Sequence, residues 1–182
     1  MINKNAQFIF VLFLILIPFT SWTEDLPKGD ITVMPFKGTT DQGKPFQLGE
    51  IKNHLTLVTM AYTSCKAACP MIVKKLKAVQ EVASGRGLHP NVLVVSFDTE
   101  HDDSKRLAMF RKHQNVPNQG WTFVSSDSAS TRKLSMILGI KFNQNPASGE
   151  IQHDNRILLV NEKGEIQKVL EGLSADPKTL FE

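Results

Sequence analysis

Hydrophobic and polar positions along the chain predict strands that alternate with helices. Two runs, residues 55–61 and 91–97, are nearly continuous in apolar residues, which is typical of strands buried on both faces. After the first run, apolar side chains recur at helical spacing over residues 71–84. The other predicted elements are a hairpin over 36–48, a helix from 102–104 to 113, a short strand over 121–124, a helix from 127–128 to Gly139, a hairpin of 156–160 with 165–170, and a short final helix from Ser174.

This order of elements predicts an α/β fold in which helices cover both faces of a central mixed sheet. A strand, a loop with two cysteines, a helix, two further strand–helix pairs and a closing hairpin follow one another as in a thioredoxin-like fold, here with an N-terminal β-hairpin. The chain of 182 residues has room for one such domain of about 160 residues. We expect a linker over residues 24–35 and the domain over residues 36–182.

The N-terminal segment is predicted to target the protein out of the cytoplasm. Lys4 precedes an apolar run over residues 8–19, which suits the core of a signal peptide and is short for a membrane span. Residues 20–23 lack a small-residue cleavage site, so residues 1–23 are expected to be either a signal peptide or an uncleaved membrane anchor. No cysteine directly follows the run, which excludes a bacterial lipoprotein anchor. We expect a periplasmic or other extracytoplasmic protein, secreted or anchored to the inner membrane.

The charge balance excludes one large class of partners. Residues 24–182 contain 20 Lys and Arg (21 less Lys4) and 18 Asp and Glu, a net charge of +2. No basic block or aromatic platform accompanies this balance, so nucleic-acid binding is not expected. The domain is expected to be a monomer.

The only two cysteines, Cys65 and Cys69, lie between the first predicted strand and the first predicted helix. Pro70 suits the first helical position, which makes Cys69 the cap residue and exposes its sulfur to the positive end of the helix dipole. Cys69 is therefore predicted to be the more acidic thiol. Three intervening residues, rather than the two usual in dithiol exchange enzymes, favour a pair that holds one ion. A structural disulfide across so short a loop would add little stability.

A third donor is needed to complete a metal site, and His153 is the best candidate. It ends a polar stretch, residues 141–155, that is expected to be an irregular functional segment. The strand that follows is expected beside the first strand, which brings His153 towards the cysteines. Two thiolates and an imidazole suit Cu(I), can also hold Cu(II), and would satisfy zinc. The remaining histidines are interpreted as surface residues or as part of an acidic turn: His54, His89, His113 and His101.

Several motifs together resemble the Sco/SenC family of copper-binding, thioredoxin-like assembly proteins, from about Phe36 to Leu173. They are residues 40–46, 62–70, 96–102 and 121–123, and His153 just before residues 157–160. The resemblance implies that Cys65, Cys69 and His153 bind copper, as Cu(I) or Cu(II), and that Asp98 corresponds to an aspartate near the site. It also implies a periplasmic or membrane-anchored protein.

The chain departs from the family pattern at three places. Lys66 and Ala67 stand between the cysteines where many members have Pro-Asp, and Thr99 follows the aspartate in place of a common proline. Gln152 precedes His153 where an acidic residue is usual, and Asp154 follows it. These departures bear on metal affinity and on the partner.

Two functions from different classes are compatible with the sequence. The first is a copper metallochaperone that delivers the ion to the copper-site subunit of cytochrome c oxidase or to another cuproprotein. The alternative is a thiol–disulfide oxidoreductase in which Cys65 and Cys69 reduce the cysteines of a partner, with no ligand role for His153. A peroxidase is the weakest candidate, because the sequence lacks a Thr-x-x-Cys motif with a supporting Arg.

Overall fold

The computed structural model describes residues 29–65, 68–145, 147 and 149–182. The predicted leader or anchor (1–23) and the first part of the predicted linker (24–28) lie outside the described residues. Within the described ranges, no helix is both long enough and apolar enough to cross a membrane.

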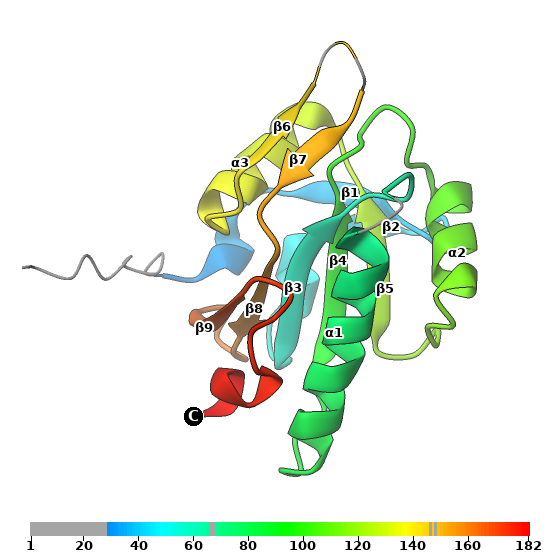
Figure 1. The fold of residues 1–182 in the computed structure, drawn as a ribbon. Coiled ribbons are helices and arrows are strands. Elements are labelled where there is room, and N and C mark those ends of the chain that lie inside the picture. Colours follow the sequence, from blue (N-terminus) through cyan, green and yellow to red (C-terminus); the bar gives the residue numbers. More distant parts are fainter. Residues whose placement is uncertain (1–28, 66–67, 146, 148) are drawn as a thin grey trace, which may run out of the picture.

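Seven strands form the central sheet: β1 (Lys37–Thr40), β2 (Pro45–Gln47), β3 (Thr56–Ala61), β4 (Asn91–Ser96), β5 (Trp121–Ser125), β8 (Arg156–Val160) and β9 (Ile166–Glu171). Their spatial order is β2-β1-β5-β4-β3-β8-β9 (Figure 1). The central strands β5, β4 and β3 are parallel, and the hairpins β1–β2 and β8–β9 add antiparallel strands at the two edges. The sheet confirms the predicted mixed α/β fold with an N-terminal hairpin, and β8 lies beside β3 as expected.

Three α-helices cover the two faces of this sheet: α1 (Ala68–Ser84), α2 (Ser104–His113) and α3 (Ser128–Ile137). Helices α1 and α2 lie on one face, as Figure 1 shows. There Trp121 Nε1 donates to Gln80 Oε1 of α1 at 3.0 Å, and the Phe110 ring of α2 meets Phe123 edge-on with centroids 6.0 Å apart. Leu138, the C-cap of α3, packs against the opposite face.

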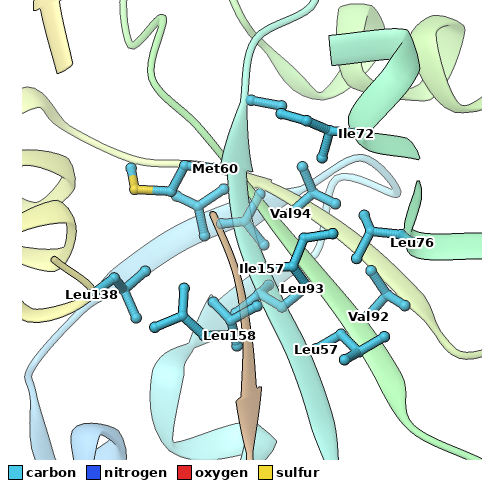
Figure 2. Close-up of a cluster of buried hydrophobic side chains, with 14 of the residues drawn as sticks. Leu57, Met60, Ile72, Leu76, Val92, Leu93, Val94, Leu138, Ile157 and Leu158 are labelled. Carbon is cyan, nitrogen blue, oxygen red and sulfur yellow. The ribbon is translucent and has the colours of Figure 1, made fainter. Parts of the chain in front are cut away.

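The burial of both sheet faces explains why the strand sequences do not alternate between apolar and polar residues. All six residues of β3 are buried, because both faces of the sheet are covered. Leu57 lies opposite Val92 in the parallel ladder, and both point towards Leu76 of α1 (Figure 2). On the other side of the sheet, Met60 lies near Leu138 (Figure 2).

The predicted helix boundaries are set by local capping. The Asp103 side chain accepts a hydrogen bond from Arg106 N at the start of α2, and Asp127 does the same for Ser130 N at the start of α3. After α3 the chain turns at Gly139, whose φ of 64° is in the left-handed region.

The segment before the domain packs more closely than a linker requires. Asp30 forms an isolated bridge with Glu165, and a short 3-10 helix, η1 (Ile31–Val33), buries Ile31 in the core. A second 3-10 helix, η2 (Leu48–Ile51), follows β2, and a third, η3 (Pro177–Phe181), takes the place of the final helix predicted from Ser174.

The polar stretch over residues 141–155 contains two short strands, which corrects the expectation of an irregular segment. It forms a separate antiparallel hairpin of β6 (Phe142–Gln144) and β7 (Ile151–His153), in which Phe142 lies opposite His153. Both strands are three residues long and mostly polar, so their sequence carries little of the alternation that predicts strands. In Figure 1 this hairpin extends above the end of β3 and beside the loop that carries the cysteines.

The parallel strands end at the same edge of the sheet. Residues 62–65 follow β3 and residues 97–103 follow β4, so both loops meet where ligands commonly bind in α/β sheets.

Candidate metal centre

Three donor atoms converge at this edge of the sheet. Cys65 and Cys69 each offer a sulfur and His153 a ring nitrogen, and the three atoms lie within 4.8 Å of one another. The Cys69 sulfur is 3.8 Å from His153 Nε2. Donors bound to one ion at about 2.3 Å for sulfur and 2.0–2.1 Å for nitrogen lie about 3.5–4.0 Å apart. The three side chains are therefore close to the arrangement that a bound metal requires.

Backbone amides hold the two sulfurs in place. Tyr62 N donates to the Cys69 sulfur at 3.4 Å, and Cys69 N donates to the Cys65 sulfur at 3.3 Å. Both sulfurs thus accept a hydrogen bond from an amide, which favours sulfur that carries negative charge, as a metal-bound thiolate does. Cys65 is half-buried and Cys69 is buried, and both are thiols.

His153 is oriented with its Nε2 lone pair towards the cysteines. Its Nδ1 lies 2.9 Å from the backbone carbonyl oxygen of Asp154, which can only accept a hydrogen bond. In the neutral imidazole Nδ1 therefore carries the hydrogen, and the lone pair of Nε2 faces Cys69. Hydrogen bonding of the second ring nitrogen is the usual way in which proteins fix a metal-binding imidazole.

Aromatic rings hold the imidazole from two sides. The His153 ring lies 4.7 Å from the Phe97 ring and meets the Tyr62 ring edge-on at 6.0 Å. Phe97 also packs against Phe142 at 4.8 Å, so the base of the β6–β7 hairpin is held by the residue that follows β4. Tyr62 OH donates to the Ile151 carbonyl at 3.2 Å, which joins β7 to the start of the cysteine loop.

Burial raises the pKa of Tyr62 to about 12, so its hydroxyl remains a donor at all ordinary pH values. Burial likewise raises the pKa of the Cys69 thiol. This corrects the prediction of an acidic Cys69. Its side chain is fully buried inside the first turn of α1, and loss of water around a thiolate there outweighs the favourable helix end.

A buried carboxylate anchors the start of the cysteine loop. Asp102 is 3% exposed and accepts hydrogen bonds from Thr63 N at 2.9 Å, Thr63 Oγ1 at 2.5 Å and Ser96 Oγ at 2.5 Å. The loop after β3 is thereby tied to the last residue of β4. The sequence analysis placed Asp102 in the 96–102 motif and at the start of the predicted helix, where Asp103 is the observed cap, and gave it no role at the centre. The sequence feature that could have identified Asp102 as part of the centre is its place in the 96–102 motif.

The residues predicted around the site fall into two groups. Cys65, Cys69 and His153 come together, whereas the carboxylate of Asp98 accepts a hydrogen bond from the backbone amide of His101 and lies 2.8 Å from the Nδ1 of that residue. The backbone amide of Asp98 donates to Ser96 Oγ at 3.0 Å. Among the described residues no further group of ligands includes a histidine, and the remaining four are exposed: His54, His89, His101 and His113.

A thioredoxin-like domain with two thiols and an imidazole at the carboxyl ends of its central strands belongs to the class of soft-metal or thiol–disulfide proteins. The chain is a member of the SCO1/SenC family, whose model matches residues 24–182. A search of curated proteins gave no match.

Solved structures share the fold at low identity. A SCO1/SenC family lipoprotein from Bacillus anthracis is 20% identical, with a TM-score of 0.73 over 80% of this chain and 88% of that one. Bradyrhizobium japonicum ScoI, solved with copper bound, is 21% identical, with a TM-score of 0.66 over 80% and 92%. BsSco, described as a member of the Sco family of cytochrome c oxidase assembly proteins with a disulfide switch, is 20% identical, with a TM-score of 0.67 over 81% and 88%.

Proposed function

We propose that this protein binds one copper ion through Cys65, Cys69 and His153 Nε2 and passes it to a respiratory copper site. The observation that carries the proposal is the convergence of the three donors within 4.8 Å, with the hydrogen of His153 fixed on Nδ1. Two sulfurs and one imidazole form a soft donor set that suits Cu(I). Family membership and the copper-bound relative support the choice of copper over zinc.

Three protein donors suit delivery because they leave room for an incoming ligand. His153 comes from the β6–β7 hairpin, which is a sheet of its own outside the seven-stranded sheet. The cysteines, in contrast, are held by the core through β3 and α1. We infer that release proceeds by withdrawal of the His153 donor while the sulfurs stay in place.

The family and the proposed compartment support a choice of recipient. A relative is described as a cytochrome c oxidase assembly protein and another as a lipoprotein. We propose that residues 1–23 direct the domain out of the cytoplasm, as signal peptide or membrane anchor, and that residues 36–182 act there as a monomer. The recipient is then the copper-site subunit of cytochrome c oxidase or another cuproprotein.

An anaerobic Cu(I) titration of the reduced domain, with a competing chelator, tests the proposal. We expect one ion per chain and about a tenfold or greater loss of affinity in His153→Ala. His101→Ala is the matched control, because that histidine is exposed and contacts Asp98 instead of the cysteines. No binding by the wild-type domain, or equal affinities in the two variants, would refute the three-donor site.

A thiol–disulfide oxidoreductase is the second candidate, and one observation favours it. Both cysteines are thiols, and their sulfurs are among the atoms that lie within 4.8 Å of one another. In that function the Cys65 thiolate attacks a partner disulfide, forms a mixed disulfide and releases one partner thiol. Cys69 then displaces the second partner thiol and closes a Cys65–Cys69 disulfide, so the partner gains two electrons. Because Cys69 is fully buried, Cys65 is the attacking sulfur, the reverse of the order expected from the helix dipole.

The reduction potential separates the two candidates. A potential well below that of the compartment, with reduction of a model disulfide that persists in His153→Ala, supports the reductase. Loss of copper binding without loss of disulfide reduction in that variant would show that copper binding requires His153 and that disulfide reduction does not.

A further inference from the structure

A groove opens beside the metal centre, between the cysteine loop and α2. Its volume is about 380 Å³, and Thr63, Ser64, Cys65 and Pro70 line one side of it. The other side is formed by one stripe of α2, with side chains at positions i, i+3, i+4 and i+7 of the helix: Arg106, Met109, Phe110 and His113.

The groove reaches the sulfur of Cys65 and not that of Cys69. Cys65 is half-buried and lines the groove, whereas Cys69 is 0% exposed and faces the core. A ligand that approaches from the groove therefore meets Cys65 first. This is the accessible side of the centre opposite the β6–β7 hairpin that carries His153.

The lining combines an apolar floor with two basic side chains. Met109 is 51% exposed on this floor, and Phe110 and Pro70 lie beside it. A flexible thioether packs against varied apolar side chains. Arg106 and His113 stand at the two ends, and none of the lining residues within the described part of the chain is acidic.

The spacing of the two basic residues fits an extended chain. Arg106 and His113 are seven positions apart in α2, which is about 10 Å along the helix. In an extended segment, side chains four positions apart lie on the same face about 13 Å apart, and the long side chains of Arg and Glu can span the difference. Two carboxylates at that separation, with an apolar side chain between them, would match the groove in charge and in shape.

We propose that this groove docks an extended acidic segment of the protein that receives the copper. One of its carboxylates pairs with the guanidinium of Arg106, the other accepts a hydrogen bond from the His113 ring, and its apolar side chain lies on Met109. The proposal rests on the proposed copper delivery and assigns the surface that holds the recipient while its donor atom approaches the ion from the Cys65 side. The recipient segment is a polypeptide rather than a nucleic acid or a lipid, because exchange at Cys65 needs a soft donor such as a thiol, thioether or imidazole next to the docked chain.

Fluorescence anisotropy with two synthetic peptides tests the groove in the metal-free, reduced protein. The first peptide has ten residues, with glutamates four apart, leucines between them and no cysteine; in the second, lysine replaces each glutamate. We expect the acidic peptide to bind about tenfold more tightly at low salt, with the difference falling as salt screens the charges.

Matched variants separate the groove from the general charge of the domain. Arg106→Glu is expected to lower the affinity for the acidic peptide about fivefold to tenfold, because the attraction between Arg106 and a peptide carboxylate becomes a repulsion. Lys112→Glu makes the same change in net charge at an exposed position outside the groove, and we expect less than a twofold effect. Met109→Ser is expected to weaken binding, whereas Met136→Ser, at a methionine of α3 that is 67% exposed, is not.

Equal binding of the two peptides, or equal effects of Arg106→Glu and Lys112→Glu, would overturn the proposal. Failure of copper delivery is recognised separately, since the peptides carry no metal ligand sulfur and the protein is metal-free. We expect Arg106→Glu to bind one Cu(I) with unchanged affinity. Preference for the acidic peptide in a protein that does not bind copper would refute the proposed function and support the docking groove. Copper binding in a protein that binds the two peptides equally would support the proposed function and refute the docking groove.

Discussion

Removal of the Asp102 carboxylate tests how the fold positions the metal centre. Asp102 ties Thr63, two residues before Cys65, to Ser96 at the end of β4. Asp102→Ala should therefore lower both the stability of the domain and its affinity for copper, although the three proposed donors remain.

The magnitude follows from the three hydrogen bonds that end on this carboxylate. Each bond to a charged group contributes about 1.5–3 kcal/mol, so their sum sets an upper limit of about 5–9 kcal/mol. Water can replace the carboxylate at Thr63, which is half-buried, but not at Ser96, which is 1% exposed. We expect a loss of about 3–5 kcal/mol in the free energy of unfolding. Copper affinity should fall about tenfold, because the cysteine loop loses its anchor.

Urea denaturation of the metal-free domain and chelator competition for Cu(I) measure the two effects. Asp103→Ala is the matched control, because it removes the N-cap of α2 and is expected to cost about 1 kcal/mol with no change in copper affinity. A loss in Asp102→Ala no larger than in this control, or an unchanged copper affinity, would refute the anchoring role.

Three other outcomes test the contacts around the centre and in the core. Tyr62→Phe removes the hydrogen bond to Ile151, so we expect about 1 kcal/mol lower stability and faster loss of copper to a chelator in stopped-flow absorbance; an unchanged rate would contradict the link between β7 and the cysteine loop. Burial raises the pKa of Cys69 above the ordinary thiol value of 9.0, so the buried thiol stabilises the metal-free protein below about pH 9. Above that pH the free energy of unfolding falls by up to about 1.4 kcal/mol per pH unit, because the thiol ionises only in the unfolded chain. The urea midpoint should fall between pH 8 and pH 10 in the wild type and fall less in Cys69→Ala. An equal fall in the two proteins would refute this effect of Cys69. Arg111→Ala leaves the buried Asp41 carboxylate without its partner at 2.7 Å and is expected to cost about 3–5 kcal/mol, with partial recovery in the double variant with Asp41→Ala; additive losses would exclude the pair as the cause.

The elements with strong periodicity were predictable from the sequence. The strands β3 and β4 are continuous apolar runs because α1, α2 and α3 cover both faces of the sheet, and the helices begin at acidic caps such as Asp103 and Asp127. The β6–β7 hairpin was not predictable in this way. Its strands have three residues each, and the contacts that order it, such as Phe97 with Phe142, join segments far apart in the sequence.

The donor residues could be predicted, but not the environment that sets their chemistry. His153 was placed near the cysteines through the expected pairing of β8 with β3, which the register bears out. The pKa of Cys69 was predicted in the wrong direction, because spacing reveals the helix end and not the depth of burial. Asp102 was missed for the same reason: a buried carboxylate and a capping carboxylate look alike in a sequence.

The origin of the donors in two distant parts of the chain has a consequence for stability. Cys69 and His153 are 84 residues apart, so one ion bound to both would close a loop of that length. A cross-link over such a loop lowers the conformational entropy of the unfolded chain by the equivalent of about 4–5 kcal/mol. The bound ion would act as a reversible cross-link between the β6–β7 hairpin and α1. A protein that carries copper would then resist unfolding and proteolysis most strongly before delivery. Once the ion has left, its free energy of unfolding would return to the lower value of the metal-free protein.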